Sequence, residues 1–307
     1  MQKIVITGGT GFVGRAVCER LFALNPGCRL VVPTRRRSIG RNLGVLPTVD
    51  LVPCDVHDAA ALPGLLAGAD AVVHLVAILH GDATAFDRAH RQLPEKLAAA
   101  CAGAGVRRVV HVSALGVETA APSAYLRSKA AGEAAWQQAA AAGAFDLHTL
   151  RPSVIFGAED RFTNLFARLL SVFPVLPLAG ANARFQPVAV GDVASAVAAC
   201  LLGRAPAGVL ECAGPEVLTL RQIVQQVGAM AGCPRPVIGL PEWAGLLQAA
   251  AMGWLPGEPL MSRDNVLSMR VPNVASGTLP GLASLGITPD ALRTLAAHFN
   301  PPDPRRR

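Results

Sequence analysis

The chain has 307 residues, of which 51% are apolar and only 16% charged, and its mean hydropathy is +0.39. This composition excludes a disordered protein and predicts a large buried core. The most apolar stretches, 71–79 and 165–178, are too short or too interrupted by proline and arginine for a membrane span, which needs about 20 apolar residues.

The net formal charge is +7, and arginine carries nearly all of the positive charge because lysine occurs only three times. Scattered arginines and 5% aromatic residues argue against nucleic-acid binding. A solvated surface explains the charge most simply; an anionic cofactor, an acidic membrane surface or an acidic partner are the alternatives.

The seven cysteines form no CxxC motif, and no metal-ligand spacing is present. We therefore expect free thiols in a reducing compartment and no metal. Because no signal-peptide pattern precedes the first apolar run, we expect a cytoplasmic protein, with peripheral attachment to the inner membrane as a variant of that location.

Apolar strand-like runs alternate with helical patterns through the first half of the chain. The expected strands are 3–7, 29–33, 49–54, 71–76, 108–112 and 145–150, and the expected helices are 12–24, 59–67, 86–102 and 123–142. This alternation predicts an α/β fold with a doubly wound parallel sheet (Rossmann), whose ligand crevice lies at the carboxyl ends of the strands.

After Pro152 prolines become frequent, and expected helices near 161–171, 191–203, 219–231 and 241–252 are separated by loops. We expect a dinucleotide-binding domain over 1–156, to which 186–212 returns. A smaller, mainly helical lobe over 157–307 would form the substrate or partner side. Its apolar helix 243–254 fits either the core of this lobe or a partner or membrane surface.

A glycine-rich turn follows the first expected strand and opens the first helix. Glycines 8, 11 and 14 permit a tight turn and a close approach to a pyrophosphate, which the helix N-terminus attracts. The predicted cofactor-binding residues of this turn are Gly8, Thr10, Gly11, Phe12, Val13 and Gly14.

The end of the second strand indicates which dinucleotide binds. An NAD site usually has a carboxylate there, but no acidic residue occurs between Glu19 and Asp50. Arg35 and Arg36 stand at this place, and a guanidinium suits a 2′-phosphate. We therefore expect NADP(H), with NAD(H) as the alternative.

Tyr125 is the single tyrosine of the chain, and Lys129 follows four residues later. In a helix these two positions share one face. A neighbouring ammonium and a helix N-terminus both stabilise a phenolate, so we expect a lowered pKa for Tyr125 and a role in proton transfer. Ser113, at the end of the fifth strand, is placed to hold a substrate oxygen.

The glycine spacing and the Ser113, Tyr125 and Lys129 set resemble the extended or atypical short-chain dehydrogenase/reductase superfamily, which includes NAD-dependent epimerases and dehydratases. The resemblance implies that these three residues are catalytic and that Lys129 also binds the nicotinamide ribose. It further implies cofactor contacts by Asp55, Val56, Leu75, Val76, Ala77, Pro152 and Val154. Phe156 is a candidate substrate contact, and Arg184 meets either an anionic substrate or a surface carboxylate.

Further motifs, among them 123–129, 151–157 and 259–265, resemble the bacterial relatives of the NADPH-binding accessory subunit (39 kDa-type) of respiratory complex I. His90 stands where many sugar-nucleotide epimerases have an asparagine. Two functions follow from this resemblance. One is an NADP(H)-dependent oxidoreductase or epimerase/dehydratase acting on an apolar, quinone- or isoprenoid-like carbonyl or alcohol. The other is a non-catalytic NADPH-binding accessory or assembly protein of a respiratory or quinone-related membrane complex.

Overall fold

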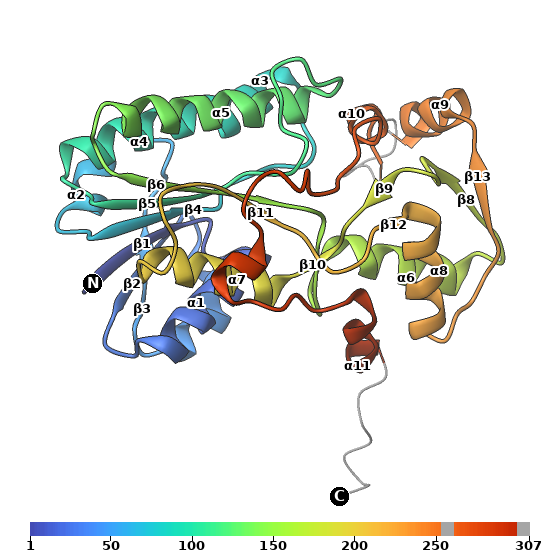
Figure 1. Ribbon diagram of the computed structural model, residues 1–307, viewed down its shortest axis with the longest axis horizontal. Coiled ribbons are helices and arrows are strands. Elements are labelled where there is room, and N and C mark those ends of the chain that lie inside the picture. Colours follow the sequence, from blue (N-terminus) through green and yellow to red (C-terminus); the bar gives the residue numbers. More distant parts are fainter. Residues whose placement is uncertain (253–260, 300–307) are drawn as a thin grey trace, which may run out of the picture.

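The computed structural model describes residues 1–252 and 261–299 (Figure 1). The end of the apolar helix expected over 243–254, the start of the 259–265 motif and the end of the predicted second lobe lie outside the described residues.

A seven-stranded parallel sheet forms the centre of the larger part of the molecule. Its strands lie in the order β11-β6-β5-β4-β1-β2-β3. They are β1 (Lys3–Thr7), β2 (Arg29–Thr34), β3 (Val49–Pro53), β4 (Ala71–His74), β5 (Arg108–Val112), β6 (Asp146–Pro152) and β11 (Gly208–Cys212). Thr7 pairs with His74 and His74 with His111, so these strands end at one edge.

Helices cover both faces of the sheet (Figure 1). One face packs against α1 (Phe12–Leu24) and α7 (Val190–Leu201), and the other against α2 (Leu62–Leu66), α4 (Leu93–Gly103) and α5 (Ala124–Ala141). Two buried apolar clusters, one on each face, hold these layers together. The predicted doubly wound α/β fold is confirmed.

A second group of elements lies at the carboxyl side of the sheet, around its own apolar cluster. Its helices are α6 (Arg161–Val172), α8 (Leu220–Met230), α9 (Glu242–Met252), α10 (Arg263–Ser268) and α11 (Ala296–Phe299). Three short strand pairs complete it: β7 (Ile155–Phe156) with β10 (Val188–Ala189), β9 (Arg184–Phe185) with β12 (Leu218–Thr219), and β8 (Leu176–Ala179) with β13 (Val237–Leu240).

Several predicted elements have different bounds in the structure, and two of these differences lie close to the glycine-rich turn and to α5. The strand expected over 71–76 ends at His74; the Leu75 N–H still donates to the Thr7 carbonyl at 3.0 Å, and the chain then passes close to Gly8. The helix expected over 86–102 consists of α3 (Ala83–Asp87), a π-helical turn at Arg88–Gln92 and α4. This turn places the His90 carbonyl oxygen against Gly132, where a Cβ would come within 2.0 Å of it.

The side chains of α9 correct one interpretation of the apolar helix. Gly245 packs on Ala179 of β8, whereas Trp243 is 67% exposed and Leu247 62% exposed. These two large side chains therefore do not belong to the core of the second lobe. None of the described helices combines the length and hydropathy needed to cross a bilayer.

Candidate active site

The turn between β1 and α1 forms a narrow cradle. Gly8 has φ +78°, and a Cβ there would lie 3.0 Å from backbone atoms of Leu75 and Val76. A Cβ on Gly14 would lie 2.5 Å from backbone atoms of Gly8 and Gly9. No side chain caps α1, whose N-cap is Gly11. The backbone N–H groups of the first turn are thus available to an anion, and the cradle fits the pyrophosphate of a dinucleotide.

Further predicted cofactor residues lie at the same sheet edge. Arg35 and Arg36 are exposed directly after β2, where Thr34 Oγ1 accepts from the Arg36 N–H at 3.3 Å and donates to the Arg36 carbonyl at 3.0 Å. After β3, Asp55 is exposed and accepts a hydrogen bond from the His57 N–H at 3.1 Å. The parallel strands place both turns beside the glycine cradle.

Lys129 connects α5 with the end of β5. Its side chain is buried, and its ammonium donates a hydrogen bond to the Val112 carbonyl at 2.9 Å. The next residue, Ser113, is also buried, and its hydroxyl has no hydrogen-bond partner among the described residues. A buried hydroxyl of this kind lowers the stability of the folded protein unless a ligand or a water molecule forms a hydrogen bond with it. Tyr125 lies one turn before Lys129 on α5, and its ring packs against Phe86 and His90.

The expected lowering of the Tyr125 pKa is wrong for the protein without ligand. Burial raises the pKa of this phenol to about 12, and burial lowers the pKa of Lys129 to about 8, against the opposing charge of Glu133. Burial disfavours the charged form of each group, and this desolvation sets the direction of both shifts. At neutral pH Tyr125 is protonated and Lys129 mostly charged, so the phenol is a proton donor.

His90 joins the loop after β4 to the first turns of α5. Its Nε2 accepts from the Ile78 N–H at 3.0 Å, so Nδ1 carries the proton and donates to Ser128 Oγ at 2.8 Å. Ser128 in turn donates to the Tyr125 carbonyl at 2.7 Å. Burial lowers the pKa of His90 to about 3, so the ring is neutral. The ring also meets Tyr125 edge-on, with centroids 5.5 Å apart.

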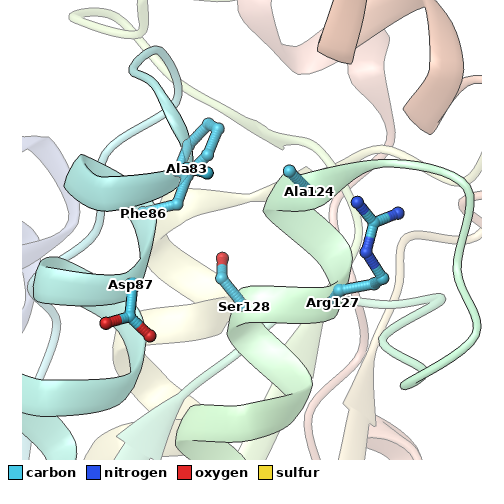
Figure 2. Close-up of a pocket in the computed structure, with 6 residues that line it drawn as sticks. All are labelled: Ala83, Phe86, Asp87, Ala124, Arg127 and Ser128. Atoms are coloured by element: carbon cyan, nitrogen blue, oxygen red, sulfur yellow. The ribbon is translucent and has the colours of Figure 1, made fainter.

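A surface pocket of about 260 Å³ lies beside this network, between α3 and the start of α5. Figure 2 shows the six residues that line it, which are Ala83, Phe86, Asp87, Ala124, Arg127 and Ser128. The Phe86 ring also contacts Tyr125, with centroids 6.1 Å apart. The pocket therefore borders the packing of Tyr125.

The strand end after β6 holds the remaining predicted residues. Pro152 is buried, and Val154 is partly exposed. Phe156 is 2% exposed within the core of the second lobe, so its side chain is occupied by packing and the predicted substrate contact is not supported. Arg184 is exposed at the start of β9, and its carbonyl accepts a hydrogen bond from the Asn273 N–H at 2.8 Å.

Asp264 and Asn273 are site residues that the sequence did not predict, although Asp264 lies within the 259–265 motif. Asp264 binds the N-terminus of α5, and Asn273 Oδ1 accepts from the Val154 N–H at 2.8 Å. Both contacts join positions more than a hundred residues apart, so no local spacing signals them. In the part of the chain that the structure describes, no group of three His, Cys, Asp or Glu side chains forms a metal cage.

The fold and this site define a Rossmann-type protein with a dinucleotide cradle and a tyrosine–lysine pair. The chain belongs to the NAD dependent epimerase/dehydratase family, whose model matches residues 4–208. The resemblance found in the sequence is thereby confirmed.

Relatives carry two kinds of name. The chain is 31% identical over 229 residues to an Arabidopsis thaliana protein, "NADH dehydrogenase [ubiquinone] 1 alpha subcomplex subunit 9, mitochondrial"; this match covers 72% of the chain and 56% of the plant protein's length. The rat protein of the same name is 29% identical, over 94% of the chain and 76% of the relative. A Caulobacter vibrioides protein named "Ceramide reductase" is 29% identical, over 81% of the chain and 76% of that protein.

Solved structures support the same fold. An Escherichia coli NADPH-dependent quinone oxidoreductase, QOR2, complexed with NADPH superposes with a TM-score of 0.78 at 20% identity, covering 96% of this chain and 99% of that one. MoeE5, in complex with UDP-glucuronic acid and NAD, superposes with a TM-score of 0.71 at 19% identity, covering 96% of this chain and 97% of MoeE5.

Proposed function

We propose that the chain is an NADP(H)-dependent reductase that acts on the carbonyl group of an apolar substrate. The observation that carries this proposal is the hydrogen bond from Lys129 to the Val112 carbonyl. It brings α5, which also bears Tyr125, to the strand end where the Ser113 hydroxyl is buried without a partner among the described residues. In this proposal residues 1–156 and 186–212 bind the cofactor, and the second lobe receives the substrate.

Each residue has a defined task in this proposal. NADPH, when bound, supplies a hydride to the carbonyl carbon. The Ser113 hydroxyl holds the carbonyl oxygen, and Tyr125 transfers its phenolic proton to that oxygen as the alcohol forms. Lys129 holds a positive charge close to the phenolate that remains and binds the ribose of the cofactor.

The direction and the substrate class rest on different support. Reduction needs a protonated phenol and oxidation a phenolate, and the Tyr125 phenol is protonated at neutral pH. Relatives named "Ceramide reductase" and "(4-alkanoyl-5-oxo-2,5-dihydrofuran-3-yl)methyl phosphate reductase" also favour reduction. The apolar second lobe favours a lipid-, quinone- or isoprenoid-like substrate, and the exposed Arg35 and Arg36 favour NADP(H) over NAD(H).

The test starts with titration of the purified protein with NADPH and NADH, followed by nicotinamide absorbance with panels of quinones, apolar carbonyls and UDP-sugars. We expect NADPH oxidation with apolar carbonyls, reduced about 10²- to 10⁴-fold in Tyr125→Phe, while NADPH binding is unchanged. Turnover of UDP-sugars alone would overturn the substrate class, and full activity of Tyr125→Phe would overturn the mechanism.

A second candidate is an NADPH-binding accessory protein of a membrane-bound respiratory or quinone-related complex, attached peripherally at the cytoplasmic side. Relatives named as NADH dehydrogenase subunits and the exposed Trp243 and Leu247 favour it. Dinucleotide binding would then stabilise the fold and a docking surface. Tight NADPH binding without turnover, unaltered in Tyr125→Phe, supports this candidate over the reductase.

A further inference from the structure

The N-terminus of α5 is bound by a carboxylate from the far end of the chain. Asp264, in the first turn of α10, accepts from the Ala124 N–H at 2.7 Å and from the Tyr125 N–H at 3.0 Å, one bond to each of its oxygens. Ser123 Oγ separately accepts from the Leu126 N–H at 3.2 Å. Ser123, which directly precedes α5, and the distant Asp264 thus satisfy the first N–H groups of the helix that carries Tyr125 and Lys129.

Neighbouring contacts fix Asp264 in this place. Ser262 and Asn265 form a capping box that starts α10. Further along, Val271 packs against Gly116 in the loop after β5, and Asn273 Oδ1 binds the Val154 N–H and Ser153 Oγ. The segment 262–273, which we call the strap, therefore lies across the carboxyl ends of β5 and β6 and is anchored at both ends.

The strap places a negative charge where α5 has its positive end. A helix N-terminus carries about half a positive charge, which would favour a phenolate nearby. Side chains in a helix lean toward its N-terminus, so the Tyr125 side chain leans toward the end that Asp264 occupies. A carboxylate there opposes ionisation of the phenol, in the same direction as burial, which raises the pKa of Tyr125.

Other charged groups near Tyr125 act alongside Asp264. On α5 they are Lys129 and Arg127; the guanidinium of Arg127 donates to the Ala121 and Pro122 carbonyls. The imidazole of His90 is neutral, and the Asp87 carboxylate is held by Arg91 and Gln92. Asp264 is the carboxylate bonded to the backbone of Tyr125 itself.

We propose that Asp264 is a positioning residue that holds the start of α5, and with it Tyr125, in place, and that its carboxylate opposes ionisation of the Tyr125 phenol. This inference deepens the proposed reductase function and rests on it for its catalytic meaning. The link between Asp264 and Tyr125 itself is testable without substrate or cofactor.

The chain offers a specific readout because Tyr125 is its only tyrosine. The tyrosinate absorption band therefore reports this residue alone. The phenolate fraction is compared between proteins at the highest pH at which far-UV circular dichroism shows all of them folded. We expect about three- to tenfold more phenolate in Asp264→Asn than in the wild type, a shift of about half to one pH unit.

Three variants separate charge from structure. Asp264→Glu keeps the charge and is expected to titrate like the wild type. Ser262→Ala weakens the start of α10 without removing a charge, so it should lower the Tm but leave the titration unchanged. Glu216→Gln removes a charge from an exposed ion pair with Arg293 and should have no effect on the titration.

An unchanged phenolate fraction in Asp264→Asn, or an equal increase in Ser262→Ala, overturns the charge effect. Unchanged hydrogen exchange of the Ala124 and Tyr125 amides in Asp264→Ala at neutral pH overturns the positioning role. Neither readout uses turnover, so an inactive wild-type protein would overturn the reductase function and leave this test intact.

Discussion

The ammonium of Lys129 lies 2.9 Å from the carbonyl oxygen of Val112, and this hydrogen bond joins α5 to β5 immediately before Ser113. The rings of His74 and His111, at the ends of β4 and β5, stack 5.4 Å apart in the same interior. Burial, with the charge of Lys129, lowers the pKa of His74 to about 3 and that of His111 well below its usual value. Lys129 is therefore the cation of this region, and burying its charge lowers the free energy of unfolding.

Lys129→Met is expected to stabilise the ligand-free protein at pH 7. The pKa of Lys129 is about 8 when folded and 10.5 in its ordinary state, so the unfolded chain binds more protons between these values. Stability of the wild type therefore rises with pH across this window, and the full cost is present below it. After loss of the bond to Val112, we expect a net gain of about 2 kcal/mol, or several degrees in Tm.

Lys96→Met is the matched control, since Lys96 also donates to a backbone carbonyl, that of His57, at 3.1 Å. The advantage of Lys129→Met over the wild type should shrink as the pH approaches 10, and thermal unfolding at several pH values measures it. A pH-independent difference, or a Tm at pH 7 below that of Lys96→Met, would contradict the prediction.

Ser113→Ala is expected to reduce turnover about a hundredfold without lowering stability. The hydroxyl is buried without a partner among the described residues, so removing it deletes an unsatisfied group and not a native hydrogen bond. Thr149→Val is the control, because the hydroxyl of Thr149 on β6 is also buried without a hydrogen-bond partner among the described residues. Equal loss of activity in both variants would show that Ser113 has no special role.

The sequence predicts the elements that local patterns determine. The bounds of β1 and α1 agree with the predicted 3–7 and 12–24, because a continuous apolar run followed by three spaced glycines leaves few alternatives. The sequence also predicts that Tyr125 and Lys129 lie on one helix, as they do in α5, where i and i+4 positions share a face.

Features that depend on distant contacts escaped prediction. The sequence places Tyr125 on a helix, but it cannot show that burial raises the pKa of the phenol, because burial depends on packing against Phe86 and His90. Asp264 lies 140 positions from Ala124, and the residues around Asp264 indicate only the start of a helix. The exposure of Trp243 likewise follows from which side of α9 meets β8.

Gly8→Ala is expected to abolish dinucleotide binding at moderate cost to stability. The positive φ strains an alanine by about 1 kcal/mol or more, and its Cβ would push on the backbone of Leu75 and Val76, which borders the cradle. Gly64→Ala is the control, since a Cβ there has no neighbour within 4 Å and alanine favours a helix. Calorimetric titration with NADPH measures the difference, and unchanged affinity in Gly8→Ala would place the cofactor elsewhere.

Arg36→Gln is expected to weaken NADPH binding about tenfold and to leave NADH binding unchanged. A charge-assisted hydrogen bond to the 2′-phosphate contributes about 1.5 to 3 kcal/mol, and NADH lacks that phosphate. Because Arg36 is exposed, the NADPH preference of the wild type should also decline with added salt. Arg293→Gln removes an exposed arginine on the second lobe that pairs with Glu216, and it should change neither affinity. Equal weakening of both cofactors in Arg36→Gln would mean that this side chain contacts a group that they share, and a wild-type preference for NADH would refute the assignment of Arg35 and Arg36.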